Sequence, residues 1–131
     1  MDHIIKTNKS DEFINVTSLI KQDVRKSGVK NGIVTVFIPH TTAGVTINEN
    51  ADPDVVYDIL TKFKEVFPKE DRYRHFEGNS HAHIKASLMG ASSTIIIEDG
   101  ELKIGTWQGI YFCEFDGPRT RKIYIKIFEA N

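Results

Sequence analysis

The sequence predicts an α+β fold with a largely antiparallel β-sheet or sandwich and about three helices. Short β-branched and aromatic runs recur along the chain, separated by turn residues. The pair Asp99-Gly100 is typical of a tight hairpin turn. Only three stretches combine helix-capping residues with helical spacing of apolar residues. Many strands and few helices therefore define the fold class.

Eight segments are expected as strands. The clearest is residues 33–38, Ile-Val-Thr-Val-Phe-Ile, which is nearly all β-branched or aromatic and is followed by Pro39. The last, residues 122–128, alternates polar and apolar side chains, as a strand with one buried face does. The other predicted strands are residues 3–6, 12–14, 45–47, 94–97, 102–104 and 110–115.

The second predicted helix has the strongest start signal. Asp52 suits the N-cap, Pro53 suits the first helical position, and Asp54 opposes the positive helix end. An apolar stripe follows at spacings of four, three and four residues: Val56, Leu60, Phe63 and Phe67.

The other two helices are predicted from their ends. The first begins after Asn15 or Thr17 and ends at Gly28. The third begins after Asn79 or Ser80, with Ile84, Leu88 and Ala91 expected to face the interior.

Composition limits the class of protein. The 131 residues suit one domain spanning 1–131, and 40% hydrophobic residues suffice for one core. A net charge of −1 gives no support for a nucleic-acid or membrane partner. The single cysteine, Cys113, excludes an internal disulfide, and no signal peptide or membrane-spanning apolar run is recognisable. We therefore expect a cytoplasmic location.

Residues 37–54 carry more hydrogen-bonding and metal-ligating side chains than a turn requires. His40, at the end of a strand, could ligate a metal or shuttle a proton, or it could be half exposed and bonded to backbone. Helix capping accounts for Asp52 without any catalytic role. Asn48 and Glu49 have no such structural explanation, and this density of polar groups indicates a site.

Residues 74–85 contain three further histidines, His75, His81 and His83. Residues two apart on a helix point about 200° apart, so His83 is expected to pair with His40 rather than with His81. A lysine in the first helical turn is unfavourable unless an anion binds nearby. Lys85 therefore indicates phosphate or carboxylate recognition, the alternative being an ordinary exposed lysine.

Three features of the C-terminal third complete the candidate set. Trp107 and Gln108 lie between two glycines, where Trp107 could stack on a heteroaromatic ring or pack at a β-bulge or subunit contact. Glu114 lies in an apolar strand and needs a partner if it is buried. Arg119 and Arg121 are interpreted as surface charges, with an anion site as the alternative.

Several of these motifs, in this order, resemble the YjbQ-like family, also described as secondary thiamine-phosphate synthase enzymes. The matching segments are Pro-His-Thr-Thr-Ala-Gly at 39–44, Thr-Ile-Asn-Glu-Asn-Ala-Asp-Pro-Asp at 46–54, Gly-Asn at 78–79, Ala-His-Ile-Lys-Ala-Ser-Leu-Met-Gly at 82–90 and Leu-Lys-Ile-Gly-Thr-Trp-Gln-Gly-Ile-Tyr at 102–111. The resemblance implies a YjbQ-like α+β fold that assembles as a homotrimer, with a polar site near the subunit contacts.

The resemblance also implies site residues and an activity. The catalytic candidates are His40, Glu49, Asp52 and His83. The substrate-binding candidates are Thr41, Thr42, Asn48, Asn79, Lys85, Trp107 and Gln108. A divalent metal, zinc or magnesium, would be held by His40, His75 and His83. The implied reaction is a transferase step that joins a hydroxymethylpyrimidine diphosphate to a hydroxyethylthiazole phosphate, giving thiamine phosphate and pyrophosphate.

Three hypotheses follow from the sequence. The first is a small enzyme that acts on a phosphorylated or otherwise anionic small molecule. The second is a trimeric module that binds a metal or a ligand without catalysis. The third is a structural oligomer in which the polar residues form a network between subunits.

Overall fold

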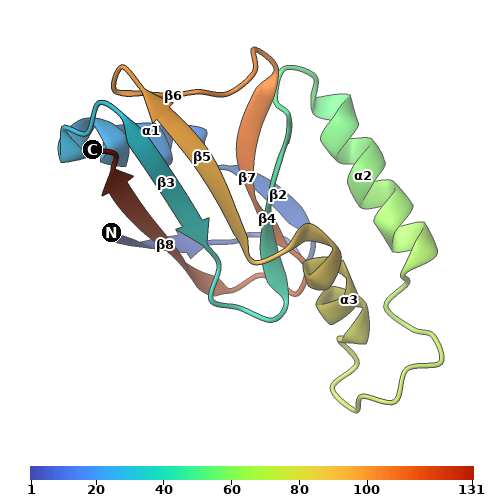
Figure 1. Cartoon of the computed structure of the whole chain (residues 1–131). Coiled ribbons are helices and arrows are strands. Elements are labelled where there is room, and N and C mark those ends of the chain that lie inside the picture. The colour runs from blue at the N-terminus through green and yellow to red at the C-terminus, as the bar shows by residue number, and fades with distance from the viewer.

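Two antiparallel sheets face each other across the interior, as the computed structural model of residues 1–131 shows (Figure 1). One sheet has five strands in the order β1-β8-β3-β5-β6, and the other has three in the order β2-β7-β4. The predicted α+β class and its three helices are confirmed. No helix is long and apolar enough to cross a membrane.

The strands and helices lie close to their predicted positions. The strands are β1 (Asp2–Lys6), β2 (Glu12–Asn15), β3 (Gly32–Phe37), β4 (Ala43–Glu49), β5 (Ser92–Glu98), β6 (Glu101–Leu102), β7 (Gln108–Glu114) and β8 (Thr120–Glu129). The helices are α1 (Thr17–Ser27), α2 (Pro53–Val66) and α3 (Ser80–Met89).

The main hydrophobic core fills the space between the two sheets. Alternate residues of the central strands point into it, including Val34 and Val36 of β3 and Ile110 and Phe112 of β7. Helix α1 closes one end of this space with buried Ile20 and its neighbours. The alternating pattern of the sequence therefore sets which face of each sheet is buried.

A second, smaller core lies on the other face of the three-stranded sheet. There α2 and α3 cover side chains of β7 that point away from the main core, such as Tyr111 and Cys113 (Figure 1). The predicted stripe on α2 packs here through Val56, Leu60 and Phe63. Asp52 caps this helix as predicted, because its Oδ1 accepts a hydrogen bond from the Asp54 amide at 2.9 Å.

Helix α3 is oriented differently from the prediction. Leu88, expected inside, is 56% exposed, whereas Ala82 and Ala86 face the sheet. Close packing against β4 explains the difference: a Cβ placed on Gly44 would lie 2.8 Å from the carbonyl oxygen of Gly90. Only small side chains fit where helix and strand approach so closely, so the large apolar residue points to solvent.

A buried ion pair joins the two sheets at the end near α3. Arg121 of β8 donates to Glu114 of β7 from Nε at 2.8 Å and from Nη2, and Nη2 also donates to Thr42 Oγ1 at 2.8 Å. The same carboxylate accepts from Thr7 Oγ1 at 2.8 Å and from the next two backbone amides. Arg121 and Glu114 are both buried, which corrects the interpretation of Arg121 as a surface charge.

These hydrogen bonds determine the ionisation of Glu114. Burial alone would raise the pKa of Glu114, but hydrogen bonds from Arg121, the Asp116 amide and Thr7 outweigh it, and the pKa is lowered from its usual value. The Glu114 carboxylate therefore stays charged, and a fully hydrogen-bonded cluster joins the two sheets.

Replacing Glu114 with Gln should lower the free energy of unfolding by about 3–5 kcal/mol, because the buried Arg121 charge loses its counter-ion. Urea denaturation followed by circular dichroism measures this change. The matched control is Arg119→Gln, which breaks an exposed ion pair with Asp116 and should cost at most about 1 kcal/mol. Equal stability of the two variants would contradict a central role for the buried pair.

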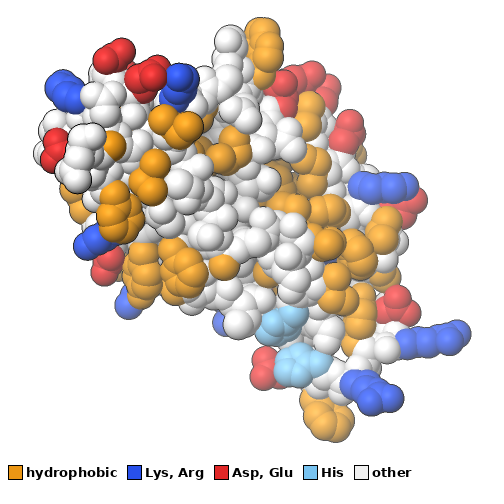
Figure 2. All heavy atoms as spheres, viewed as in Figure 1, with side chains coloured by type: hydrophobic (Ala, Val, Ile, Leu, Met, Phe, Trp, Pro, Cys, Tyr) orange, Lys and Arg blue, Asp and Glu red, His pale blue; other side chains and the backbone are white.

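The outer face of the five-stranded sheet is not covered by any helix. Large apolar side chains are exposed on it: Ile4, Ile33, Phe37, Ile96 and Phe128. Figure 2, viewed toward this face, shows orange side chains spread across it between the polar ones. Exposed apolar groups on neighbouring strands are typical of an interaction surface.

Candidate functional site

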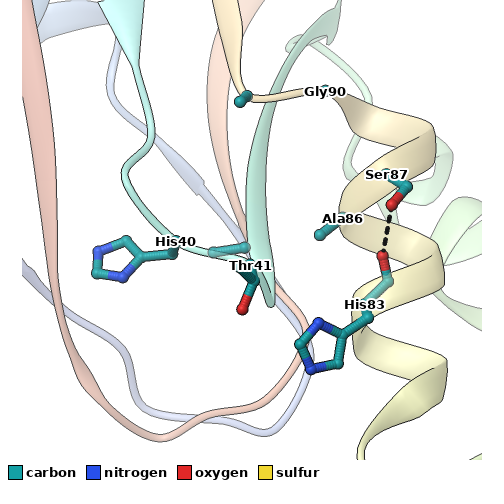
Figure 3. Close-up of a pocket in the computed structure, with 8 residues that line it drawn as sticks. His40, Thr41, His83, Ala86, Ser87 and Gly90 are labelled. Carbon is teal, nitrogen blue, oxygen red and sulfur yellow. Dashed lines mark hydrogen bonds between the residues drawn. The ribbon is translucent and has the colours of Figure 1, made fainter.

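Two adjoining hollows lie between the β3–β4 loop and the start of α3, and they share His40, Thr41 and His83. We call them together the histidine cleft (Figure 3). The first, about 490 Å³, is also lined by Ala43, Ala86, Ser87, Gly90 and Ala91. The second hollow, about 430 Å³, is also lined by Pro39, Thr42, His75, Glu77, Asn79, Asp116, Arg119 and Arg121. His40 and His83 thus line the same two hollows.

His40 lies just after β3 and is held by the neighbouring strand. Its Nε2 accepts a hydrogen bond from the Lys122 amide at 2.8 Å, so the proton of the neutral ring is on Nδ1. Burial and then the nearby Arg121 charge lower the pKa of His40, which favours this neutral form. His40 is therefore oriented as a donor from Nδ1.

His83 and His75 meet on the other side of Thr41. Their ring centroids are 5.6 Å apart with the planes at 87°, an edge-to-face contact. His75 Nε2 lies 4.0 Å from Glu77 Oε2. Figure 2 shows histidine side chains reaching the surface together at the lower edge of the molecule. This half of the cleft is open to solvent.

The three predicted metal ligands do not form a metal-binding cluster in this geometry. The lone pair of neutral His40 is already used by the Lys122 amide. No group of three or more His, Cys, Asp or Glu side chains is placed to hold an ion. His75 and His83 could contribute two ligands, and a metal there would need at least one more.

Asn79 has an unsatisfied oxygen in the wall of the cleft. It is the N-cap residue of α3, but its side chain makes no capping bond. Instead Nδ2 donates to Asp116 Oδ2 at 2.9 Å, and Oδ1 is buried without any hydrogen-bond partner. A buried polar atom without a partner is unfavourable unless a ligand or water supplies a donor.

Two arginines and two carboxylates, Asp116 and Glu77, complete the electrostatics. Arg119 donates from Nε to the Asp116 carbonyl at 2.7 Å and from Nη2 to Asp116 Oδ2 at 2.8 Å. Burial would raise the pKa of Asp116, but hydrogen bonds from Asn79 and Arg119 lower it below its usual value. Arg121 uses Nε and Nη2 for Glu114 and Thr42. The cleft is thus lined by the guanidinium groups of Arg119 and Arg121 and by a neutral His40 ring that keeps one N–H donor.

The predicted Asn48, Glu49 and Asp52 lie away from the histidine cleft in the same chain. Ala43 and Glu49 are the first and last residues of β4, so Glu49 lies about 20 Å along the strand from Ala43. Asn48 Oδ1 accepts from the Glu49 amide at 2.7 Å, and Glu49 Oε2 accepts from the Ala51 amide at 2.8 Å. These side chains support the turn into α2, so their catalytic and binding roles stay predictions that would require a second chain.

Trp107 and Gln108 lie at that same far end, opposite Glu49 across the β4–β7 pair. Trp107 is 64% exposed, and Gln108 Oε1 accepts from the Gly105 amide at 2.8 Å. Within one chain, neither side chain reaches the histidine cleft.

Lys85 and Thr42 are both buried, and only Thr42 lines the histidine cleft. Lys85 lies on the side of α3 away from His83, where Nζ is 3.2 Å from Asp11 Oδ2 and 3.0 Å from His81 Nδ1. Thr42 lines the cleft, but its hydroxyl accepts from Arg121. Thr41, by contrast, is exposed and lines both hollows.

Some cleft residues were missed from the sequence. Arg121 has the same strand phase as Ile123 and Ile125, which are buried, so the alternation of β8 could have identified it as inward-facing. Asp116 and Glu77 carry no comparable signal, because both lie in loops whose course only the fold determines.

Comparisons with known proteins identify the family of this chain. A family model described as "UPF0047 protein YjbQ-like" matches residues 2–130. UPF0047 protein YugU of Bacillus subtilis is 56% identical over 124 residues, which is 94% of each chain. UPF0047 protein MJ1081 of Methanocaldococcus jannaschii is 55% identical over 123 residues, covering 94% of this chain and 89% of that one.

Two solved structures have the same fold. A YjbQ/UPF0047 family protein of Clostridium acetobutylicum superposes with a TM-score of 0.96 at 62% identity, covering 98% of this chain and 99% of that one. A YbjQ-like protein of unknown function from Sulfolobus solfataricus gives 0.94 at 37% identity, covering 99% and 96%. With a family match along almost its whole length and relatives more than half identical to it, the chain belongs to the UPF0047 YjbQ-like protein family.

Proposed function

We propose that the protein is a small enzyme that acts on a phosphorylated or otherwise anionic small molecule in the histidine cleft. The observation that carries this proposal is the buried Asn79 Oδ1 without a partner, in a hollow that also contains His40, His83 and two arginines. Such a wall offers both acceptors and donors at one place. A ligand with acidic oxygens and at least one N–H or O–H group would satisfy it.

The side chains divide the chemical tasks between them. His40 donates from Nδ1, and the guanidinium groups of Arg119 and Arg121 add positive charge where an anionic group would be bound or released. His83, whose ring opens to solvent, is the candidate general acid or base. Asn79 holds Asp116 in the wall of the cleft through its Nδ2.

Thiamine-phosphate synthesis is the candidate reaction. In it the bond from the pyrimidine methylene carbon to the diphosphate oxygen breaks, and a bond from that carbon to the thiazole nitrogen forms. The leaving pyrophosphate gains negative charge, which His40 Nδ1–H and the two arginines could stabilise.

We also propose that the chain assembles as a homotrimer. The exposed apolar side chains on the outer face of the five-stranded sheet support self-association through that face. Contact between subunits would remove these side chains from water, a gain of about 25 cal/mol for each Å² of apolar surface.

Replacing His83 with Ala should lower turnover of the pyrimidine diphosphate and thiazole phosphate pair by about 10²–10⁴-fold, because the acid or base is lost. Release of pyrophosphate measures the rate, and Leu88→Ala, exposed on the same helix, is the control. Full turnover of His83→Ala would place the chemistry outside the cleft. Tight binding of both substrates without turnover by the native protein would favour the non-catalytic binding module.

The variant Glu49→Gln tests whether a second chain completes the cleft. Since Glu49 lies at the far end of β4, turnover should stay within about threefold of the native rate. A loss as large as that of His83→Ala would instead mean that Glu49 of a neighbouring subunit reaches the cleft.

Replacing Ile96 with Lys should dissociate the trimer, because a charge would be buried in the contact. Light scattering after size-exclusion chromatography measures the molecular mass, and Val66→Lys on α2 is the exposed apolar control. A trimer that survives Ile96→Lys would rule out this face as the contact.

A further inference from the structure

A second cavity lies on the opposite side of α3 from the histidine cleft. Its volume is about 270 Å³, and it opens beside a groove of about 500 Å³ along α2. The cavity is lined by Ser10, Asp11, Lys64, Lys69, His81, Lys85, Phe115, Asp116 and Gly117. The groove shares Ser10, Asp11 and Lys64 with it and adds Lys9. We call the two together the lysine cavity.

Lys85 forms the closed end of the lysine cavity. Its side chain is only 2% exposed, and Nζ contacts Asp11 Oδ2 at 3.2 Å and His81 Nδ1 at 3.0 Å. An ammonium group has three N–H donors, and these two contacts use two of them. The third remains for a ligand in the cavity.

His81 adds a second donor at the same place. Because its Nδ1 accepts from Lys85, the proton of the neutral ring is on Nε2. Burial, and then the charge of Lys85, lower the pKa of His81 and keep the ring neutral. His81 therefore acts as a neutral N–H donor rather than as a base.

The charges around the cavity favour an anion. Lys9, Lys64, Lys69 and Lys85 line the cavity and its groove, against Asp11 and Asp116. Asp116 is already paired with Arg119, which leaves Asp11 as the one carboxylate that opposes four lysines. An ion pair that only fastened Asp11 to α3 would need Lys85 alone, not three further lysines around an open cavity.

We propose that the lysine cavity is a second binding site, for a small phosphate-type oxyanion held between Lys85, His81 and the lysines at the entrance. This goes beyond the proposed function, because the cavity is on the other side of α3 from the catalytic histidines. The anion would accept from Lys85 Nζ at the closed end, while Lys64 and Lys69 neutralise its outer oxygens.

Histidine side-chain NMR tests the site with inorganic phosphate as the probe. The two faces of α3 carry separate reporters, His81 in the lysine cavity and His83 in the histidine cleft. Phosphate is added at constant pH and ionic strength, balanced with chloride. The double variant Lys64→Ala/Lys69→Ala removes two exposed charges from the cavity, and Lys26→Ala/Lys103→Ala removes two exposed charges elsewhere.

We expect the His81 signals to shift to saturation with phosphate. The phosphate concentration at the midpoint of this shift should rise about tenfold in Lys64→Ala/Lys69→Ala and stay unchanged in the control double variant. Acetate should act more weakly, because it has one charge and fewer acceptor oxygens. The site is overturned if His81 does not respond, if both double variants behave alike, or if acetate binds more tightly. A response of His83 alone would overturn this site and leave the proposed function intact.

Discussion

The buried pair of Arg121 and Glu114 is the interaction on which the rest of this structure depends. It joins β8 of one sheet to β7 of the other, and through Thr42 it holds the loop that carries His40. The buried Glu114 carboxylate accepts hydrogen bonds on both oxygens, from side chains and from backbone amides. The pair therefore fixes the separation of the sheets and the position of the cleft wall at once.

Helix α3 divides the polar chemistry of the molecule into two compartments. Its packing on Gly44 leaves room only for alanine toward the sheet, so the polar residues of the helix point sideways. His83 then opens to one cavity, while His81 and Lys85 face the other. Asp116 lines both compartments and binds Asn79 between them. A single close contact between helix and strand thus sets the chemistry on each side.

Much of the fold could be predicted, because its elements have local signals. Strand β3 is nearly all β-branched, and Asp52 and Pro53 mark the start of α2. Helix geometry indicated that His81 and His83 would point to different sides of the helix, and they line different cavities. The burial of Lys85 could not be predicted, because its partner Asp11 is 74 residues away in sequence. The distance of Glu49 from His40 depends on the direction and length of β4, which motif order along the chain does not give.

The most direct test of whether the histidine cleft binds and uses an anionic substrate is a crystal structure of the protein grown with pyrophosphate. We expect a phosphate oxygen within about 2.7–3.2 Å of His40 Nδ1 and a second one at a guanidinium nitrogen of Arg119 or Arg121. Pyrophosphate bound elsewhere while the cleft holds only water, or a His40 ring whose Nδ1 faces away from the cleft, would contradict this role.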